Sequence, residues 1–303
     1  MDARRCGGWP SPVSSVALGP QFASVVCSTA VPVPGGRRRR QGTRVRAGPI
    51  IASIRKSLTY AVGDVHGRFD LLEPALALIA RHSGGEPGQV IFLGDYVDRG
   101  PDSRRVVERL MQVQKAGAAV CLKGNHEDLM IRALTDTARA SYWRWCENGG
   151  LQTLRSYGVD DEAEARARVP REHLRWMAGL PLTTTDGARI YVHAGLAPRT
   201  AFHRQTEASC LWIRERFLRA KAKEFEAHIV HGHTPFWEGK PDPAEPELLP
   251  HRTNLDTGAF ATGVLSIGVF DPDVAGGPVE VLSVRGEPRD VARSEIIDAQ
   301  ETR

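Results

Sequence analysis

The sequence has few cysteines, and their spacing is that of neither a metal-binding motif nor a disulfide framework. Five cysteines occur in 303 residues, an odd number, and no CxxC pair is present. An odd count without such pairs is typical of proteins from a reducing compartment. We therefore expect a cytoplasmic location and no structural zinc site built on thiolates.

Long apolar runs are also missing. No stretch approaches the roughly 20 apolar residues that a helix needs to cross a bilayer, so we expect no membrane partner. Apolar residues make up 41% of the chain and charged residues 25%, which is ordinary for a globular protein. A chain of this length can bury one large core.

Acidic residues are almost absent from the first 56 residues. Ten Arg or Lys stand there against one acid, Asp2, in a stretch rich in Gly, Pro and Ser and without apolar periodicity. We predict that residues 1–56 form a disordered basic extension and that residues 57–303 form the folded domain. Three interpretations of the extension stay open: an organelle transit peptide, a polyanion-binding arm, or a segment upstream of the true start.

The predicted domain is mildly acidic once the extension is set aside. Of the 40 basic and 36 acidic residues of the whole chain, 30 and 35 remain from residue 57 onward, a net charge of −5. Domains that bind nucleic acid usually carry a basic surface instead. We therefore expect no nucleic-acid partner for the domain.

The first part of the domain alternates short apolar strands with amphipathic helices. Strands are predicted at 58–62, 90–93 and 118–122, and each is followed by a loop that contains glycine. Asp70 and Glu73, after the first loop, resemble a capping box at the start of a helix. Loops spaced about 30 residues apart indicate βαβ units. Because parallel strands point their carboxyl ends to one side, these loops are expected to converge.

The later part of the domain has a different pattern. Residues 127–180 are helical and aromatic, which predicts a helical cap segment over the site, and the proline-rich segment 241–250 is predicted to be a solvated loop. Further strands are predicted at 189–192, 229–230, 252–255, 264–270 and 279–284. Units of βα type followed by antiparallel strands predict an α/β fold made of two sheets packed as a sandwich.

Four polar fragments lie at the ends of predicted strands. They are GDVHG from Gly63, GDYVDRG from Gly94, GNHE from Gly124 and HGHT from His231. Carboxylates, imidazoles and an amide suit divalent cations such as manganese, iron or zinc. Two such cations can offset the charge of a phosphate ester and lower the pKa of a water between them. The candidate ligands are Asp64, His66, Asp95, Asn125, His193 and His233.

These fragments, together with VHAGL and GHTP, resemble the signature blocks of the phosphoprotein phosphatase family within the calcineurin-like metallophosphoesterases. The resemblance implies two mixed sheets packed as a sandwich and flanked by helices. It also implies two divalent metal ions, with manganese expected first and iron or zinc as alternatives. Asp64, His66 and Asp95 would hold the first ion, and Asp95, Asn125, His193 and His233 the second.

One position separates this chain from general metallophosphoesterases. Those proteins commonly end the last block as GHxH, whereas this chain reads GHTP with Pro235 in the last place. Proline cannot bind a metal, so the first ion is expected to have one protein ligand fewer. The resemblance is therefore to the phosphatase branch, and within it to the bacterial serine/threonine type.

Two arginines are candidates for binding phosphate. Arg99 can bind two phosphate oxygens at once, a geometry that lysine cannot reproduce. Arg214, in the stretch LWIRERF, resembles the second phosphate-binding arginine of the family, with Arg216 and Arg219 as alternatives.

A histidine and an aspartate are candidates for proton transfer. His126 is expected to point away from the metals toward the leaving oxygen and to act as the general acid. Asp98 is expected to orient the His126 ring and to favour its protonated form.

The expected activity is metal-dependent hydrolysis of phosphomonoesters by a serine/threonine protein phosphatase, with tyrosine as a further target. One alternative is a symmetrical bis(5'-nucleosyl)-tetraphosphatase, so the expected substrate is a phosphoprotein or a phosphorylated small molecule. The aromatic residues of segment 143–158 would then either stack a base or pack a cap. A further alternative is an inactive phosphoesterase scaffold that binds polyanions through its basic extension.

Overall fold

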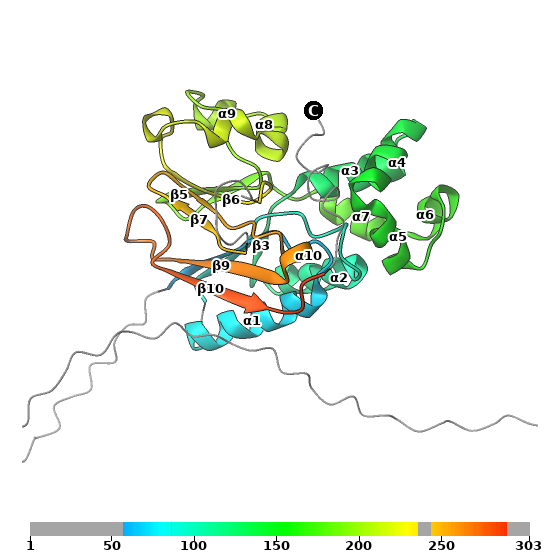
Figure 1. Ribbon diagram of the computed structural model, residues 1–303, viewed down its shortest axis with the longest axis horizontal. Helices are drawn as coiled ribbons and strands as arrows, with labels where there is room; N and C mark the ends of the chain where they lie inside the picture. The colour runs from blue at the N-terminus through cyan, green and yellow to red at the C-terminus, as the bar shows by residue number, and fades with distance from the viewer. Residues whose placement is uncertain (1–56, 86, 236–243, 290–303) are drawn as a thin grey trace, which may run out of the picture.

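A computed structural model describes residues 57–85, 87–235 and 244–289. The predicted basic extension lies outside these residues, as does part of the predicted loop 241–250. The described chain forms two five-stranded sheets that pack against each other, with helices on the outer faces (Figure 1). The predicted α/β sandwich is confirmed.

Both sheets are mixed. The first sheet has the order β10-β9-β1-β2-β3, in which β1, β2 and β3 are parallel and β9 and β10 antiparallel to their neighbours. Its strands are β1 (Thr59–Val62), β2 (Gln89–Phe92), β3 (Val120–Cys121), β9 (Val264–Phe270) and β10 (Glu280–Arg285).

The second sheet has the order β4-β5-β6-β8-β7, with β5, β6 and β8 parallel and the two edge strands antiparallel. Its strands are β4 (Thr183–Thr185), β5 (Arg189–Val192), β6 (His228–His231), β7 (Glu247–Leu249) and β8 (Arg252–Asn254). Side chains from both sheets, such as Ile91 and Val230, share one buried cluster between them.

Helices cover the outer faces of the sandwich because each buries one apolar stripe. The first sheet is covered by α1 (Phe69–Ser83) and α2 (Ser103–Lys115), whose Leu72 and Leu110 lie in its core. The second sheet is covered by α8 (Glu207–Trp212) and α9 (Glu215–Leu218), with Phe217 fully buried. A short α10 (Ala259–Thr262) precedes β9.

A helical segment with its own apolar core follows β3 and contacts α2. It contains α3 (Asn125–Thr135), α4 (Arg139–Trp145), a π-helical turn (Cys146–Gly150), α5 (Leu151–Tyr157), α6 (Glu162–Arg168) and α7 (Arg171–Ala178). Within segment 143–158, Trp145 and Tyr157 are buried in this core, whereas Trp143 is 55% exposed. Two of its three aromatic residues therefore pack the helical segment, which is the second of the two alternatives given for them.

Three local predictions were wrong. Helix α1 begins at Phe69 without a side-chain cap, because the Asp70 carboxylate accepts hydrogen bonds from Arg68 instead. The short strand β4 was not predicted, and β7 lies within the segment predicted to be a loop. Both are three-residue strands at the edges of the second sheet. They form because a neighbouring strand supplies their hydrogen bonds, and three residues are too few to show a strand pattern in the sequence.

Among the described residues, no helix combines the length and the apolar character that a membrane span requires.

Candidate functional site

The polar loops meet at the carboxyl ends of the parallel strands of both sheets. Asp64 and His66 follow β1, and Asp95 follows β2. From the second sheet, His193 follows β5 and His233 follows β6. Asn125 opens α3 directly after the β3 loop. All six predicted ligands are buried, with 5% exposure or less.

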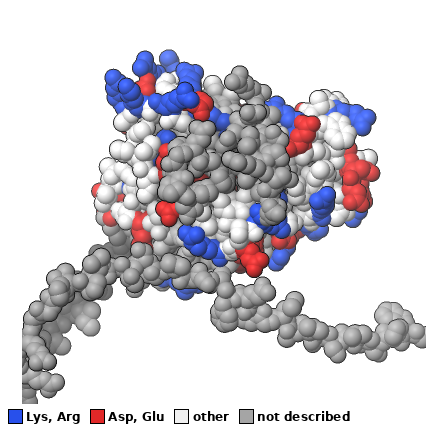
Figure 2. Space-filling view, viewed as in Figure 1, with Lys and Arg blue, Asp and Glu red and all other residues white. Residues whose placement is uncertain are grey.

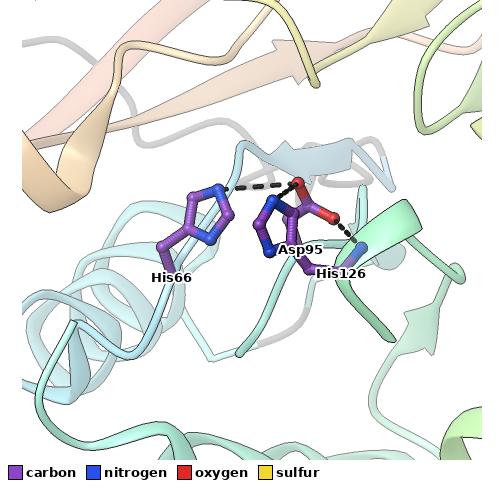
Figure 3. A group of neighbouring side chains, drawn as sticks. All are labelled: His66, Asp95 and His126. Carbon is purple, nitrogen blue, oxygen red and sulfur yellow. Dashed lines mark hydrogen bonds and ion pairs between the residues drawn. The ribbon is translucent and has the colours of Figure 1, made fainter. Parts of the chain in front are cut away.

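Asp95 lies at the centre of this cluster. Its Oδ2 atom is 3.5 Å from His66 Nε2, and its Oδ1 atom is 3.3 Å from His193 Nε2 (Figure 3 shows the His66 side). His193 Nε2 is also 2.8 Å from Asn125 Oδ1. Two sets of side chains are close enough to hold a metal ion, and Asp95 belongs to both: His66, Asp95 and His126, and Asp95, His193 and His233.

Two buried ligand atoms in the pocket have no hydrogen-bond partner. They are Asp64 Oδ1 and His233 Nε2. The other carboxylate oxygen of Asp64 accepts from the backbone N–H of His233 at 3.0 Å, which ties the two loops together. A buried polar atom without a partner costs free energy. A bound metal ion would supply the missing partner for both atoms.

The histidines of the pocket are held in the neutral form that metals require. Burial lowers the pKa of His66 and His233 well below the ordinary value, and the neighbouring arginines add to the effect. Burial likewise lowers the pKa of His193 to about 4. The remaining ring nitrogens of His66 and His193 contact the carbonyl oxygens of Val97 and Leu93, which fix the rings.

The carboxyl groups of the pocket repel one another. Burial raises the pKa of Asp64 well above the ordinary value, and Asp256 and Asp95 raise it further. Burial also raises the pKa of Asp95 to about 7 and that of Asp256 to about 6. Divalent cations would offset this clustered negative charge, so the donor set fits the expected metal ions.

The backbone is strained around the pocket. Five residues of the site, other than glycine, have positive φ angles: His66, Asp95, Asp98, Arg99 and His233, with φ between 42° and 73°. Such conformations persist only where the surrounding structure holds them. Here the positive φ angles turn the side chains of these short loops toward the pocket.

Glu127 holds the central loop in place, a role that sequence analysis missed. Its carboxylate accepts hydrogen bonds from the backbone N–H groups of Gly124, Asp95 and Tyr96 at 2.8–2.9 Å. Glu127 is the last residue of the GNHE fragment, so its place in that motif could have indicated a role in the site. Glu127 therefore fixes the position of Asp95 from the first turn of α3.

Asp98 contacts His126, as predicted, through a distance of 2.7 Å between Asp98 Oδ2 and His126 Nδ1. The same carboxylate accepts from Trp145 Nε1 at 2.9 Å and from Thr153 Oγ1 at 2.7 Å. Sequence analysis missed these two residues, which come from the helical segment. The helical segment thus contacts the site through the Asp98 carboxylate, and its role as a cap over the site stays a prediction.

His126 presents its Nε2 atom to the pocket, 3.9 Å from Asp95 Oδ2 (Figure 3). Its role as general acid stays a prediction. The metal-free pocket does not stabilise the protonated ring that Asp98 was expected to favour. Burial lowers the pKa of His126 well below the ordinary value, and Arg99 and His66 lower it further.

The two predicted phosphate-binding arginines both reach the pocket. Arg99 Nη1 is 2.8 Å from His66 Nε2, and its guanidinium lies over the Phe260 ring. Arg214 donates to Thr234 Oγ1 at 3.0 Å, and burial followed by Arg99 lowers its pKa to about 10. The alternatives Arg216 and Arg219 are exposed.

A family model described as calcineurin-like phosphoesterase matches residues 58–260, from β1 to α10. The chain belongs to this family. A bis(5'-nucleosyl)-tetraphosphatase PrpE of the asymmetrical type, from Oceanobacillus iheyensis, is 27% identical over 220 residues, 65% of this chain and 82% of that protein. Serine/threonine-protein phosphatase 1 from Salmonella typhimurium is 29% identical over 183 residues, 58% and 78% of the two chains.

Solved structures agree on the fold. The crystal structure of a proposed diadenosine tetraphosphatase matches with a TM-score of 0.52 at 21% identity, and the match covers 78% of this chain and 96% of that chain. The calcineurin-like resemblance is thus confirmed, as is the sandwich of two mixed sheets flanked by helices. The bacterial serine/threonine branch stays a prediction.

Proposed function

We propose that this protein is a metal-dependent phosphomonoester hydrolase acting on phosphoserine and phosphothreonine in proteins, with phosphotyrosine as a further target. The observation that carries the hydrolase part is the pair of buried, unpartnered ligand atoms, Asp64 Oδ1 and His233 Nε2, in a pocket of neutral imidazoles and crowded carboxyl groups around Asp95. Buried polar side-chain atoms are paired in the large majority of cases.

We assign two divalent cations to the pocket, with manganese first and iron or zinc as metals that the same donors accept. Such ions, when bound, offset the charge of the phosphate and lower the pKa of a water molecule. The first ion is assigned to Asp64, His66 and Asp95, and the second to Asp95, Asn125, His193 and His233. His126 Nε2 lies close enough to the first group to be an additional ligand.

The other residues bind the phosphate and move the proton. Arg99 and Arg214 bind phosphate oxygens, since both guanidinium groups reach the pocket. Water adds to phosphorus in line with the departing oxygen, and no side chain forms a covalent intermediate. His126 gives its Nε2 proton to that oxygen while Asp98 holds Nδ1. A bound phosphate dianion favours the protonated ring, opposing the effect of burial on its pKa.

Two observations support a phosphoprotein as the substrate. Pro235 replaces the last histidine of the GHxH block, as in the phosphatase branch. One relative is a serine/threonine phosphatase. Symmetrical hydrolysis of a bis(5'-nucleosyl) tetraphosphate is the second candidate, because another relative is a bis(5'-nucleosyl)-tetraphosphatase of the symmetrical type. The intact donor set argues against the third alternative, an inactive scaffold that binds polyanions.

A parallel assay separates these candidates. Purified protein supplied with manganese would be given a panel of phosphoserine, phosphothreonine and phosphotyrosine peptides and, separately, diadenosine tetraphosphate. We expect phosphate release from the phosphoserine and phosphothreonine peptides. Turnover of the tetraphosphate alone would contradict the protein-phosphatase assignment, and no turnover of any substrate would contradict the hydrolase assignment.

A further inference from the structure

A group of exposed basic side chains lies on the elements that follow the β5 loop, on both sides of Arg214 in the chain. We call it the basic patch. Figure 2 shows Lys and Arg gathered at the upper left of the molecule, near α9. The patch consists of Arg199, Arg204, Arg216, Arg219, Lys221 and Lys223, all exposed.

The charge of this region is opposite to that of the remaining domain. Residues 199–226 contain seven Arg or Lys and four Glu, a net charge of +3. The other residues from 57 to 303 contain 23 basic and 31 acidic residues, a net charge of −8. A region of net positive charge on a domain of net negative charge attracts anions preferentially.

Only part of the patch is neutralised by neighbours. Arg199 pairs with Glu224 at 2.8 Å, and Arg219 pairs with Glu215 at 2.5 Å. The other four cations of the patch form no ion pair with any residue in the described part of the chain. Arg199, Arg216 and Arg219 line a cavity of about 520 Å³ together with Glu215 and Glu224, which pair with Arg219 and Arg199. The excess positive charge of the patch therefore lies on Arg216 in the cavity and on Arg204, Lys221 and Lys223, which are not among the residues that line it.

The patch continues directly from the phosphate-binding end of the site. Arg214, which reaches the pocket, immediately precedes α9. Arg216 lies in α9 and Arg219 is its C-cap residue, two and five positions after Arg214 in the chain. The patch therefore adjoins the arginine that reaches the pocket.

We propose that the basic patch binds acidic residues that flank the phosphorylated residue of a polypeptide substrate. This inference rests on the proposed protein-phosphatase function and names the class of substrate: phosphoproteins with Asp or Glu near the target residue. A polypeptide fits better than a nucleic acid. A long polyanion would extend past the patch over a surface of net negative charge, whereas a short acidic segment ends within it.

Binding can be measured separately from turnover. The full chain would be titrated with a fluorescein-labelled oligoglutamate peptide and with the matching oligoglutamine peptide, by fluorescence anisotropy. The test variant is Arg216→Glu with Lys221→Glu. The matched control is Arg171→Glu with Arg175→Glu, which makes the same charge change on exposed residues of α7. We expect the test variant to bind oligoglutamate about tenfold more weakly and the control to bind as the wild type does.

Kinetics supply the second readout. With an acidic-flanked phosphopeptide, the test variant is expected to show a KM raised about tenfold at unchanged kcat. Its kcat/KM for p-nitrophenyl phosphate, which has no flanking residues, should equal that of the wild type. The proposal is overturned if the wild type binds both peptides equally, if the two double variants behave alike, or if an oligonucleotide of equal charge binds more tightly than oligoglutamate.

The two proposals fail in different ways. If the wild type hydrolyses p-nitrophenyl phosphate but no phosphopeptide, the protein-phosphatase assignment fails, and the anisotropy comparison alone decides whether the patch binds acidic segments. If phosphopeptides are hydrolysed without preference for acidic flanks, the patch proposal fails and the assigned function stands.

Discussion

At the residue scale, Asp95 is the side chain on which the site depends most. Its two oxygens face different histidines, and both candidate metal groups include it. The loop that carries it is strained, with φ at 52°, and is held by Glu127. Asp95 therefore lies between the two candidate metal groups, in a conformation that the surrounding structure has to hold.

We expect Asp95→Asn to lose both metal and activity. An amide removes the negative charge and one oxygen donor, so the protein should bind less than the two metal ions assigned and lose more than about a hundredfold in kcat. Metal content by mass spectrometry, measured beside kcat for p-nitrophenyl phosphate, checks this. Full activity in the variant would contradict the shared position of Asp95.

His126→Asn tests a different role. If His126 donates the proton, kcat should fall by about a hundred- to ten-thousandfold while the metals stay bound. The loss should be smaller for p-nitrophenyl phosphate, whose phenolate leaves without a proton, than for phosphoserine peptides. Since His126 Nε2 also lies within reach of the first ion position, a loss of metal would identify it as a ligand instead.

At the element scale, the turn between α4 and α5 supports the Arg99 loop. The Arg99 N–H donates to the carbonyl oxygen of Gly149 at 3.1 Å, and Gly149 has a φ of 99°. A Cβ atom at Gly149 would lie 2.7 Å from Arg99 Cγ. This close approach explains why the π-helical turn requires glycine there.

Gly149→Ala should therefore weaken phosphate binding. We expect the variant to lose about 1 kcal/mol of stability from the positive φ and to show a raised KM because Arg99 is displaced. Gly158→Ala is the matched control: its φ is 67°, and nothing lies within 4 Å of the added Cβ. The control should lose similar stability at an unchanged KM, and equal KM values in the two variants would contradict the role of this turn.

At the scale of the whole molecule, the site joins the two sheets. Asp64, His66 and Asp95 lie in loops of the first sheet, and His193 and His233 in loops of the second. Metal ions bound here would cross-link the sandwich, and binding to the folded state alone adds to its stability.

Metal removal should accordingly lower the melting temperature of the whole domain by several degrees, in one transition. Re-adding manganese should restore it. At pH 6, manganese binding should also release protons, because the pKa of Asp95 in the metal-free site is about 7 and that of Asp64 is raised as well. Calorimetry in buffers of different ionisation enthalpy measures this release. Independence of the heat from the buffer would contradict it.

Removal of residues 2–56 tests the predicted division of the chain. The family match begins at residue 58 and the described structure at residue 57. We expect the shortened protein to keep its melting temperature and its kcat for p-nitrophenyl phosphate. A large loss of either would show that the basic extension belongs to the working domain.

The sequence by itself determined the strand and loop order and the kinds of ligand. Short apolar strands followed by GDVHG, GDYVDRG and GNHE place polar residues at one edge of a parallel sheet, because the right-handed βαβ connection leaves no other arrangement. That logic is local, since each motif lies within a few residues of its strand. The tight loops, which hold Asp95 and Asp98 at positive φ, follow from the same short stretches.

Only the tertiary structure decided how the site is supported. The hydrogen bonds from Trp145 and Thr153 to Asp98 join residues 47 and 55 positions apart. No periodicity in the sequence signals such pairs, because they depend on how the helical segment packs against α2. The same reason applies to the edge strands β4 and β7, and to Arg214, which reaches the pocket while Arg216 and Arg219 are exposed. The position of each of these residues and strands depends on contacts with residues that are distant in the sequence and that only packing brings close.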